Sequence, residues 1–235
     1  MRKKIIQLPK GYISYSQIQL WKNDRERYKA LYFDNRDELR ISNKGMEYGK
    51  EVASALERGE SVDDVVTDTA MSLLPKYDVA DKEIKAAMKT KDGEITLLGR
   101  PDTMDSITHD FREYKTGRVP WTASKAQNHP QMVFYAMLIY IAYGTKLNHA
   151  FLDWIETYEE GGVVKPTGHI QSFEVRFALR DILDCMAETA KVAKEIEAEW
   201  IFHVPDPKLQ WDGPTEACAE CGGWERHRQE CVKCE

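Results

Sequence analysis

The sequence lacks any apolar run long enough to cross a bilayer, and its basic start is followed only by the short apolar stretch Ile5-Ile6-Gln7-Leu8. These absences argue against a membrane protein and against a secretory signal, so we expect a cytoplasmic protein. An excess of positive charge is also missing, because the net charge is −6. Any binding to nucleic acid would therefore need local basic patches or metal ions held by carboxylates.

Cysteine is scarce in most of the chain. Of the five cysteines, four form two Cys-x-x-Cys pairs near the C-terminus: Cys218, Cys221, Cys231 and Cys234. Two such pairs so close together predict four thiolates around one Zn²⁺. We expect this zinc to be structural, because four protein ligands leave no open position for a substrate. Two disulfides are the alternative, which a cytoplasmic location disfavours. The fifth cysteine, Cys185, falls in a predicted helix and is expected to be a small buried hydrophobic residue.

What is present fits one globular domain with an appendage. The chain has 235 residues, of which 42% are hydrophobic and 31% charged. Val204-Pro-Asp-Pro207 and Trp211-Asp-Gly-Pro214 are typical of a linker. We therefore predict a main domain over residues 1–203, a linker over 204–217 and a metal-binding tail over 218–235.

Apolar residues at helical spacing predict four long helices. The first begins at Ser14 and continues to Tyr32, and the others cover about Lys44–Arg58, Ser124–Tyr143 and Leu179–Phe202. The first helix also carries four basic residues on its outer face: Lys22, Arg25, Arg27 and Lys29. These could contact a phosphate backbone, but the acidic residues among them favour a solvated face.

Strand signals surround a central polar segment. Residues 83–89 and 94–100 predict a hairpin because an Asp-Gly turn separates them, and residues 111–115 are expected to complete a three-stranded meander. Two more strands, 149–157 and 168–177, flank Gly161-Gly162. Together with the helices, they predict a mixed α/β fold.

Three charged residues are the candidate site. Glu113 and Lys115 lie two apart in a predicted strand and therefore point to the same side. A turn containing Ser106, His109 and Asp110 would bring Asp102 beside them. Two carboxylates suit Mg²⁺ or Mn²⁺. The alternative is an ordinary solvated hairpin face.

Several motifs occur together in one order: Ile13-Ser-Tyr-Ser16, Gly49 with Glu57, Gly99-Arg-Pro-Asp102, Glu113-Tyr-Lys115-Thr-Gly117 and Gln131-x-x-x-Tyr135. With these motifs the chain resembles the PD-(D/E)XK nuclease superfamily over roughly residues 12–202. Within it, the chain is similar to the RecB-type branch, which includes CRISPR-associated adaptation nucleases and phage exonucleases. The resemblance implies a restriction-endonuclease-like core, with a mixed central sheet flanked by helices.

The resemblance also implies a function and a set of roles. It implies a metal-dependent DNA nuclease, an exonuclease acting on single-stranded DNA or free ends in processing, recombination, repair or phage replication, with recombination or replication proteins as partners. Asp102, Glu113 and the backbone carbonyl of Tyr114 would bind Mg²⁺ or Mn²⁺, and Lys115 would orient or deprotonate the attacking water. Gln131 would position Lys115 or the phosphate, and Tyr135 would support it or contact the strand. A non-catalytic DNA-binding scaffold and a structure-specific endonuclease are the alternatives.

Two departures from the family pattern matter. Much of the branch has a metal-binding histidine in the second helix where this chain has Ala53, so either Glu57 substitutes or water completes the metal shell. The iron–sulfur members take one cluster ligand from a cysteine of the N-terminal helix, where this chain has Asn23. The second departure favours Zn²⁺ over an iron–sulfur cluster in the tail.

Overall fold

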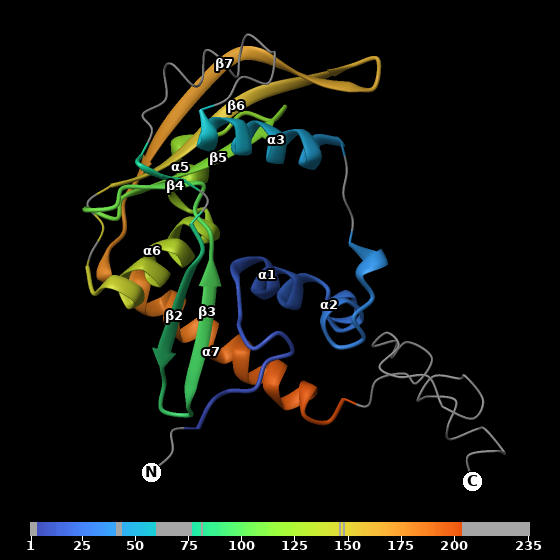
Figure 1. Cartoon of the computed structure of the whole chain (residues 1–235), viewed down its shortest axis with the longest axis vertical. Helices are drawn as coiled ribbons and strands as arrows, with labels where there is room; N and C mark the ends of the chain where they lie inside the picture. The colour runs from blue at the N-terminus through green and yellow to red at the C-terminus, as the bar shows by residue number, and fades with distance from the viewer. Residues whose placement is uncertain are drawn as a thin grey trace, which may run out of the picture.

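The computed structural model describes residues 4–40, 44–59, 77–80, 82–145, 147 and 149–203. A five-stranded sheet has the order β1-β4-β5-β6-β7, and a separate two-stranded sheet pairs β2 with β3 (Figure 1). The five-stranded sheet consists of β1 (Val79–Ala80), β4 (Thr103–Met104), β5 (Phe111–Gly117), β6 (Ala150–Glu160) and β7 (Val163–Val175). Strands β5 and β6 run parallel, and the other pairs are antiparallel. The predicted mixed α/β sheet flanked by helices is confirmed.

The predicted three-stranded meander is wrong. Strands β2 (Ile84–Lys89) and β3 (Glu94–Gly99) pair only with each other in the named sheets, and β5 lies between β4 and β6. The chain leaves β3 at Arg100-Pro101, where Pro101 has no N–H to continue a ladder. Asp102 therefore precedes β4 instead of ending β3.

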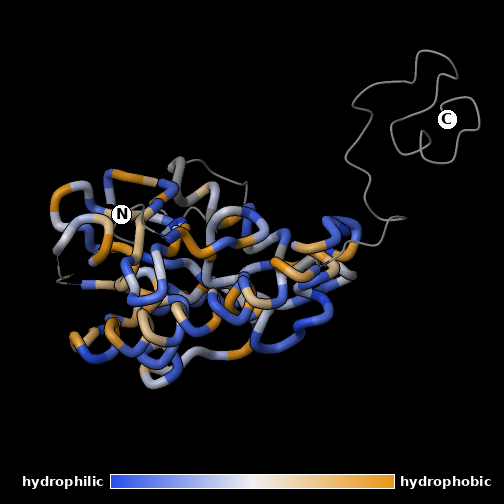
Figure 2. The backbone as a smooth tube through the Cα atoms, turned by 90° about the horizontal axis from the view of Figure 1, so that it is seen from below, coloured by the Kyte–Doolittle hydropathy of each residue, from blue (hydrophilic) through white to orange (hydrophobic). Residues whose placement is uncertain are grey.

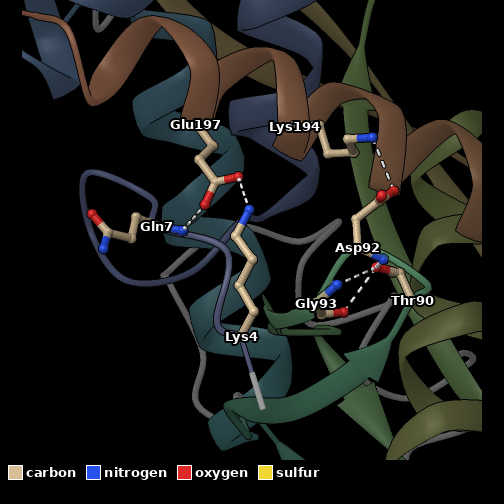
Figure 3. Close-up of polar contacts among 7 residues, drawn as sticks. All are labelled: Lys4, Gln7, Thr90, Asp92, Gly93, Lys194 and Glu197. Carbon is tan, nitrogen blue, oxygen red and sulfur yellow. Dashed lines mark hydrogen bonds and ion pairs between the residues drawn. The ribbon is translucent and has the colours of Figure 1, made fainter. Parts of the chain in front are cut away.

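The β2–β3 hairpin is fastened to the N-terminal segment and to the last long helix, α7 (Leu179–Trp200). The predicted turn is present, and Thr90 Oγ1 donates to the Gly93 carbonyl at 2.8 Å. Asp92 of this turn pairs with Lys194 of α7 at 2.9 Å, and Glu197 accepts hydrogen bonds from Lys4 and from the Gln7 backbone N–H (Figure 3). The Asp92–Lys194 pair joins the hairpin to α7, the Glu197 bonds join the N-terminal segment to α7, and the Ile6 N–H donates to the Glu94 carbonyl of the hairpin at 2.9 Å.

The predicted first helix is two helices, α1 (Tyr15–Asn23) and α2 (Arg25–Tyr32). Ser14 caps α1 as predicted, and Asp24 caps α2 by accepting from the Arg27 N–H at 3.0 Å. An Asp that caps a new helix interrupts the preceding one, because its backbone leaves the helical region. A short 3₁₀ helix, η1 (Asp37–Leu39), follows.

Three of the four basic residues on the outer face of α1 and α2 are partly exposed and paired with acidic residues. Ion pairs join α1 and α2 to glutamates of α7: Lys22 to Glu188 at 3.0 Å, Arg25 to Glu195 at 2.6 Å and Lys29 to Glu199 at 2.7 Å. Arg27 donates instead to the Leu39 carbonyl. This face of the first two helices therefore contacts α7.

The helix predicted over Ser124–Tyr143 is also divided, into α5 (Ala123–Gln127) and α6 (Pro130–Tyr143). Proline favours the first position of a helix and disfavours helical geometry in the residue before it, so His129 marks the break. The middle of α6, from Phe134 to Ile139, is buried. In Figure 1, α6 lies between the sheets and α7.

Helix α3 (Lys44–Arg58) has the predicted bounds and packs on β5. It lies on the face of β5 opposite to α6, because it contacts Thr116, whereas the neighbouring Lys115 bonds to Gln131 of α6. Gly49 permits the approach, because a Cβ there would lie 2.8 Å from Thr116 Oγ1. Val52 and Ala55 are buried as the helical stripe predicts. The Glu57 side chain lies outside the described side chains.

Among the described residues, the core is mainly apolar and contains the buried ion pair of Arg112 and Asp153. The Arg112 guanidinium donates two hydrogen bonds to the Asp153 carboxylate at 2.7 and 2.8 Å, and Ser172 donates to the same carboxylate at 2.6 Å. Elsewhere, hydrophobic and hydrophilic residues alternate over short intervals (Figure 2). Within the described ranges, no helix is long and apolar enough to cross a membrane.

Residues 204–235 lie outside the described residues. The predicted linker and the four-cysteine site of Cys218, Cys221, Cys231 and Cys234 therefore stay predictions from sequence.

Candidate active site

The β4–β5 pair brings the three charged candidates together. Thr103 lies opposite Arg112 in the antiparallel register, so Asp102 lies beside Glu113 on the next step. Asp102 Oδ2 accepts a hydrogen bond from the Tyr114 N–H at 2.5 Å, which fixes the carboxylate at the edge of β5. Lys115 Nζ donates to Glu113 Oε1 at 2.6 Å. The turn of residues 105–110 that makes this possible is the polar turn expected from the sequence.

Glu113 is a buried acid with one unused oxygen. Its side chain is 5% exposed, and Oε2 has no hydrogen-bond partner among the described residues. Burial raises the pKa of Glu113, while the Lys115 ammonium opposes that rise. A buried carboxylate oxygen without a donor costs free energy. A cation in front of Oε2 would offset that cost.

A chain of hydrogen bonds holds Lys115 from the side of α6. Tyr135 OH donates to the Arg100 carbonyl at 3.0 Å and accepts from Gln131 Nε2 at 3.0 Å. Because a carbonyl only accepts, the Gln131 amide must direct its nitrogen to Tyr135 and its oxygen to Lys115, where the distance is 2.9 Å. Burial and the Glu113 charge raise the pKa of Tyr135, so its hydroxyl stays a donor.

The backbone adds an oxygen to the same edge of the strand. In a β-strand the N–H and C=O of one residue point to the same edge, so the Tyr114 carbonyl lies on the side of Asp102. Two carboxylates and one carbonyl are hard ligands of the kind Mg²⁺ and Mn²⁺ take with several waters. Within the described ranges, no group of three or more His, Cys, Asp or Glu side chains is arranged so that it could hold a metal ion, so such an ion would rely on this smaller set.

Two residues near the site carried no functional prediction. His129 lies two positions before Gln131 in the chain, and the charge of Lys115 contributes, after burial, to lowering the pKa of His129 to about 4. The pKa of Tyr15 is raised, mainly by burial and then by the charge of Glu113. The His-Pro pair at the start of α6 was the available signal for His129, and Tyr15 lies within the Ile13-Ser-Tyr-Ser16 motif, which was read only as a helix start.

Comparisons with known proteins give fold-level similarity only. The chain matches no protein-family model and no curated protein sequence. Among 17 matching chains of solved structures, SSO0001 has 10% identity and a TM-score of 0.45, with 83% of this chain and 78% of that chain covered. A phage-related exonuclease from Haemophilus somnus 129PT has 11% identity and a TM-score of 0.45, covering 85% and 96%.

A further solved structure is Rai1 of Candida albicans in complex with pU5 and Mn²⁺. It has 10% identity and a TM-score of 0.32, with 87% of this chain and 63% of that chain covered. With identities and TM-scores this low, no residue is assigned a role from these structures. The chemistry of the site follows from its own geometry.

Proposed function

We propose that this chain is a divalent-metal-dependent nuclease that hydrolyses phosphodiester bonds in DNA, as an exonuclease. The observation that carries the proposal is the buried Glu113 Oε2, which has no partner among the described residues and belongs to a carboxylate adjacent to Asp102. An oxygen in this position is poorly explained by folding stability, because it lowers stability. Cation binding explains it.

The ligand set is Asp102, Glu113 and the Tyr114 carbonyl. Bound Mg²⁺ or Mn²⁺ would supply Lewis acidity toward the phosphodiester and toward water. Asp102 is already oriented by the Tyr114 N–H, so little reorganisation is needed for binding. Glu57 stays an additional ligand predicted from sequence.

Lys115 is arranged to orient a reactant. Its ammonium has three donors, of which two bond to Glu113 and Gln131. Both partners are acceptors, and one donor is left for a phosphate oxygen or a water. We therefore assign Lys115 to orientation and charge stabilisation, with Gln131 and Tyr135 positioning it.

The test is cleavage of end-labelled DNA with and without Mg²⁺ or Mn²⁺. Asp102→Asn keeps an oxygen for the Tyr114 N–H but removes the charge, so it should abolish cleavage while the thermal melt stays close to that of wild type. Asp92→Asn is the matched control, because Asp92 pairs with Lys194 at the β2–β3 turn and has no part in the site. Full cleavage by Asp102→Asn would refute the assignment.

The alternatives predicted from sequence give different results in the same assay. DNA binding without metal-dependent degradation would support a non-catalytic scaffold. Cleavage of closed circular DNA would support an endonuclease, since an exonuclease needs an end. Degradation of linear DNA alone supports the proposal.

A further inference from the structure

A cavity of about 390 Å³ lies between α1, the start of α6 and α7. Its apolar wall includes three aromatic side chains and a histidine: Tyr15, Phe134, Phe177 and His129. Cavities of this size class hold small organic groups. None of the residues proposed to bind the metal lines it.

The cavity nevertheless adjoins the candidate active site. Tyr15 and His129 line the cavity, and their pKa values respond to the charges of Glu113 and Lys115 respectively. His129 also ends the loop directly before α6, two residues from the Gln131 that holds Lys115. A substrate at Lys115 could therefore extend past His129 into the cavity.

Positive and negative side chains lie on different sides of His129. Lys115 and Lys125 act on its pKa and do not line the cavity, whereas three carboxylates do: Asp181, Asp184 and Glu188. The one lysine in the lining, Lys22, is paired with Glu188. A phosphate is repelled by such a wall, but an uncharged group with N–H donors can bond to it.

The histidine adds a polar contact to the aromatic part of the cavity wall. Burial is the first cause of its lowered pKa, so His129 is neutral near pH 7. Its Nδ1 is buried and has no hydrogen-bond partner among the described residues. Aromatic faces with a few polar groups are suited to nucleobases, which stack and hydrogen-bond at once.

We propose that this cavity receives an unpaired nucleobase of the strand being cleaved, next to the scissile phosphate, with the backbone on the side of Lys115 and Lys125. The inference rests on the proposed nuclease function. It specifies the substrate class as single-stranded DNA or a frayed end, because a base held in a duplex stack is unavailable to the cavity.

The test uses short oligothymidylates with one abasic position, moved along the strand. The backbone is unchanged, so chemistry at phosphorus is preserved while one base is removed. Cleavage beside the abasic position should fall about tenfold, the order expected for losing one base–aromatic stacking contact. A uniform cleavage pattern would overturn the inference and leave the proposed function intact.

A filling variant provides an independent arm. Val133 lines the cavity from α6, so Val133→Phe should occupy it and slow cleavage of the intact strand about tenfold, with little further effect beside an abasic position. Val163→Phe is the matched control, because Val163 is exposed at the β6–β7 turn. Equal slowing of both substrates by Val133→Phe would contradict base binding.

Binding separates the two proposals if no cleavage is found. Fluorescence anisotropy of labelled intact and abasic strands measures the same preference without chemistry. Tighter binding of the intact strand, lost in Val133→Phe, would support the cavity while the nuclease function fails. Equal binding of both strands would overturn the cavity as well.

Discussion

Replacement of Glu113 by Gln tests whether its buried oxygen is kept for a metal. The change removes a buried charge whose Oε2 has no partner among the described residues. Removal of the buried negative charge should gain about 1–3 kcal/mol, because the neutral amide NH2 that takes the place of Oε2 costs less to bury unpaired than a carboxylate oxygen, and loss of charge assistance in the bond to Lys115 should cost about 1 kcal/mol. The variant should therefore be more stable than wild type by about 1 kcal/mol in chelator, a rise of roughly 2–4 °C in the melting temperature.

The pH dependence of unfolding gives independently the sign of the stability change in Glu113→Gln. The folded-state pKa of Glu113 is raised above the ordinary value of 4.5, so its contribution to stability is present at low pH and is lost as pH rises through the folded-state value. The amide that replaces the carboxyl in the variant does not titrate. The stability gain of Glu113→Gln should consequently be small near pH 4 and larger near pH 8.

Metal should reverse the order of stabilities. Mn²⁺ at about 100 times its dissociation constant would stabilise wild type by about 2.7 kcal/mol and the variant much less. The assay is urea unfolding with chelator or Mn²⁺, with Glu160→Gln as control, since Glu160 is exposed and pairs only with Lys165 among the described contacts. If Mn²⁺ shifts wild type and Glu113→Gln equally, the reasoning is wrong.

Three further changes test the frame around the site. Asp153→Asn strands the buried Arg112 guanidinium and should cost about 3–5 kcal/mol in urea unfolding, most of it recovered when Arg112 becomes Met as well. Since the folded-state pKa of His129 is lowered from 6.5 to about 4, its contribution to stability should be lost as pH falls between those values, by about 1–2 kcal/mol after allowance for partial exposure, and His129→Phe should lack this loss. Gly99→Ala would put a Cβ 2.9 Å from the Tyr135 ring, so it should cost about 1–3 kcal/mol in thermal unfolding and slow cleavage; unchanged values would mean that the ring yields freely.

Local signals in the sequence predicted most elements. The Ser14 cap, the Asp-Gly turn and Gly161-Gly162 each lie where expected, because the residues that decide them are neighbours in the chain. The divisions at Asp24 and Pro130 were also local and could have been predicted from capping and proline rules. They were not predicted because apolar residues at helical spacing continue across both divisions.

Strand order was beyond the same reasoning. Apolar alternation marks β3 and β5 as strands but does not say which strands pair, since pairing depends on what covers each face. Asp102, Glu113 and Lys115 could still be found together, because a short turn fixes their spacing. The Tyr135 bond to the Arg100 carbonyl, across 35 residues, required the structure.

The proposed function requires a chain of net negative charge to bind a polyanion, and the distribution of its cations bears on this requirement. Lys22, Arg25 and Lys29 are paired with glutamates of α7, so the charge of the most basic helix face predicted from sequence is compensated within the fold. Lys115, by contrast, is held by two acceptors with a third donor to spare, inside a partly buried site where a charge acts more strongly than on the surface. Placement, more than total charge, therefore decides where a phosphate can bind. In the proposed function, the carboxylates that line the cavity beside His129 would keep the phosphate on the side of Lys115.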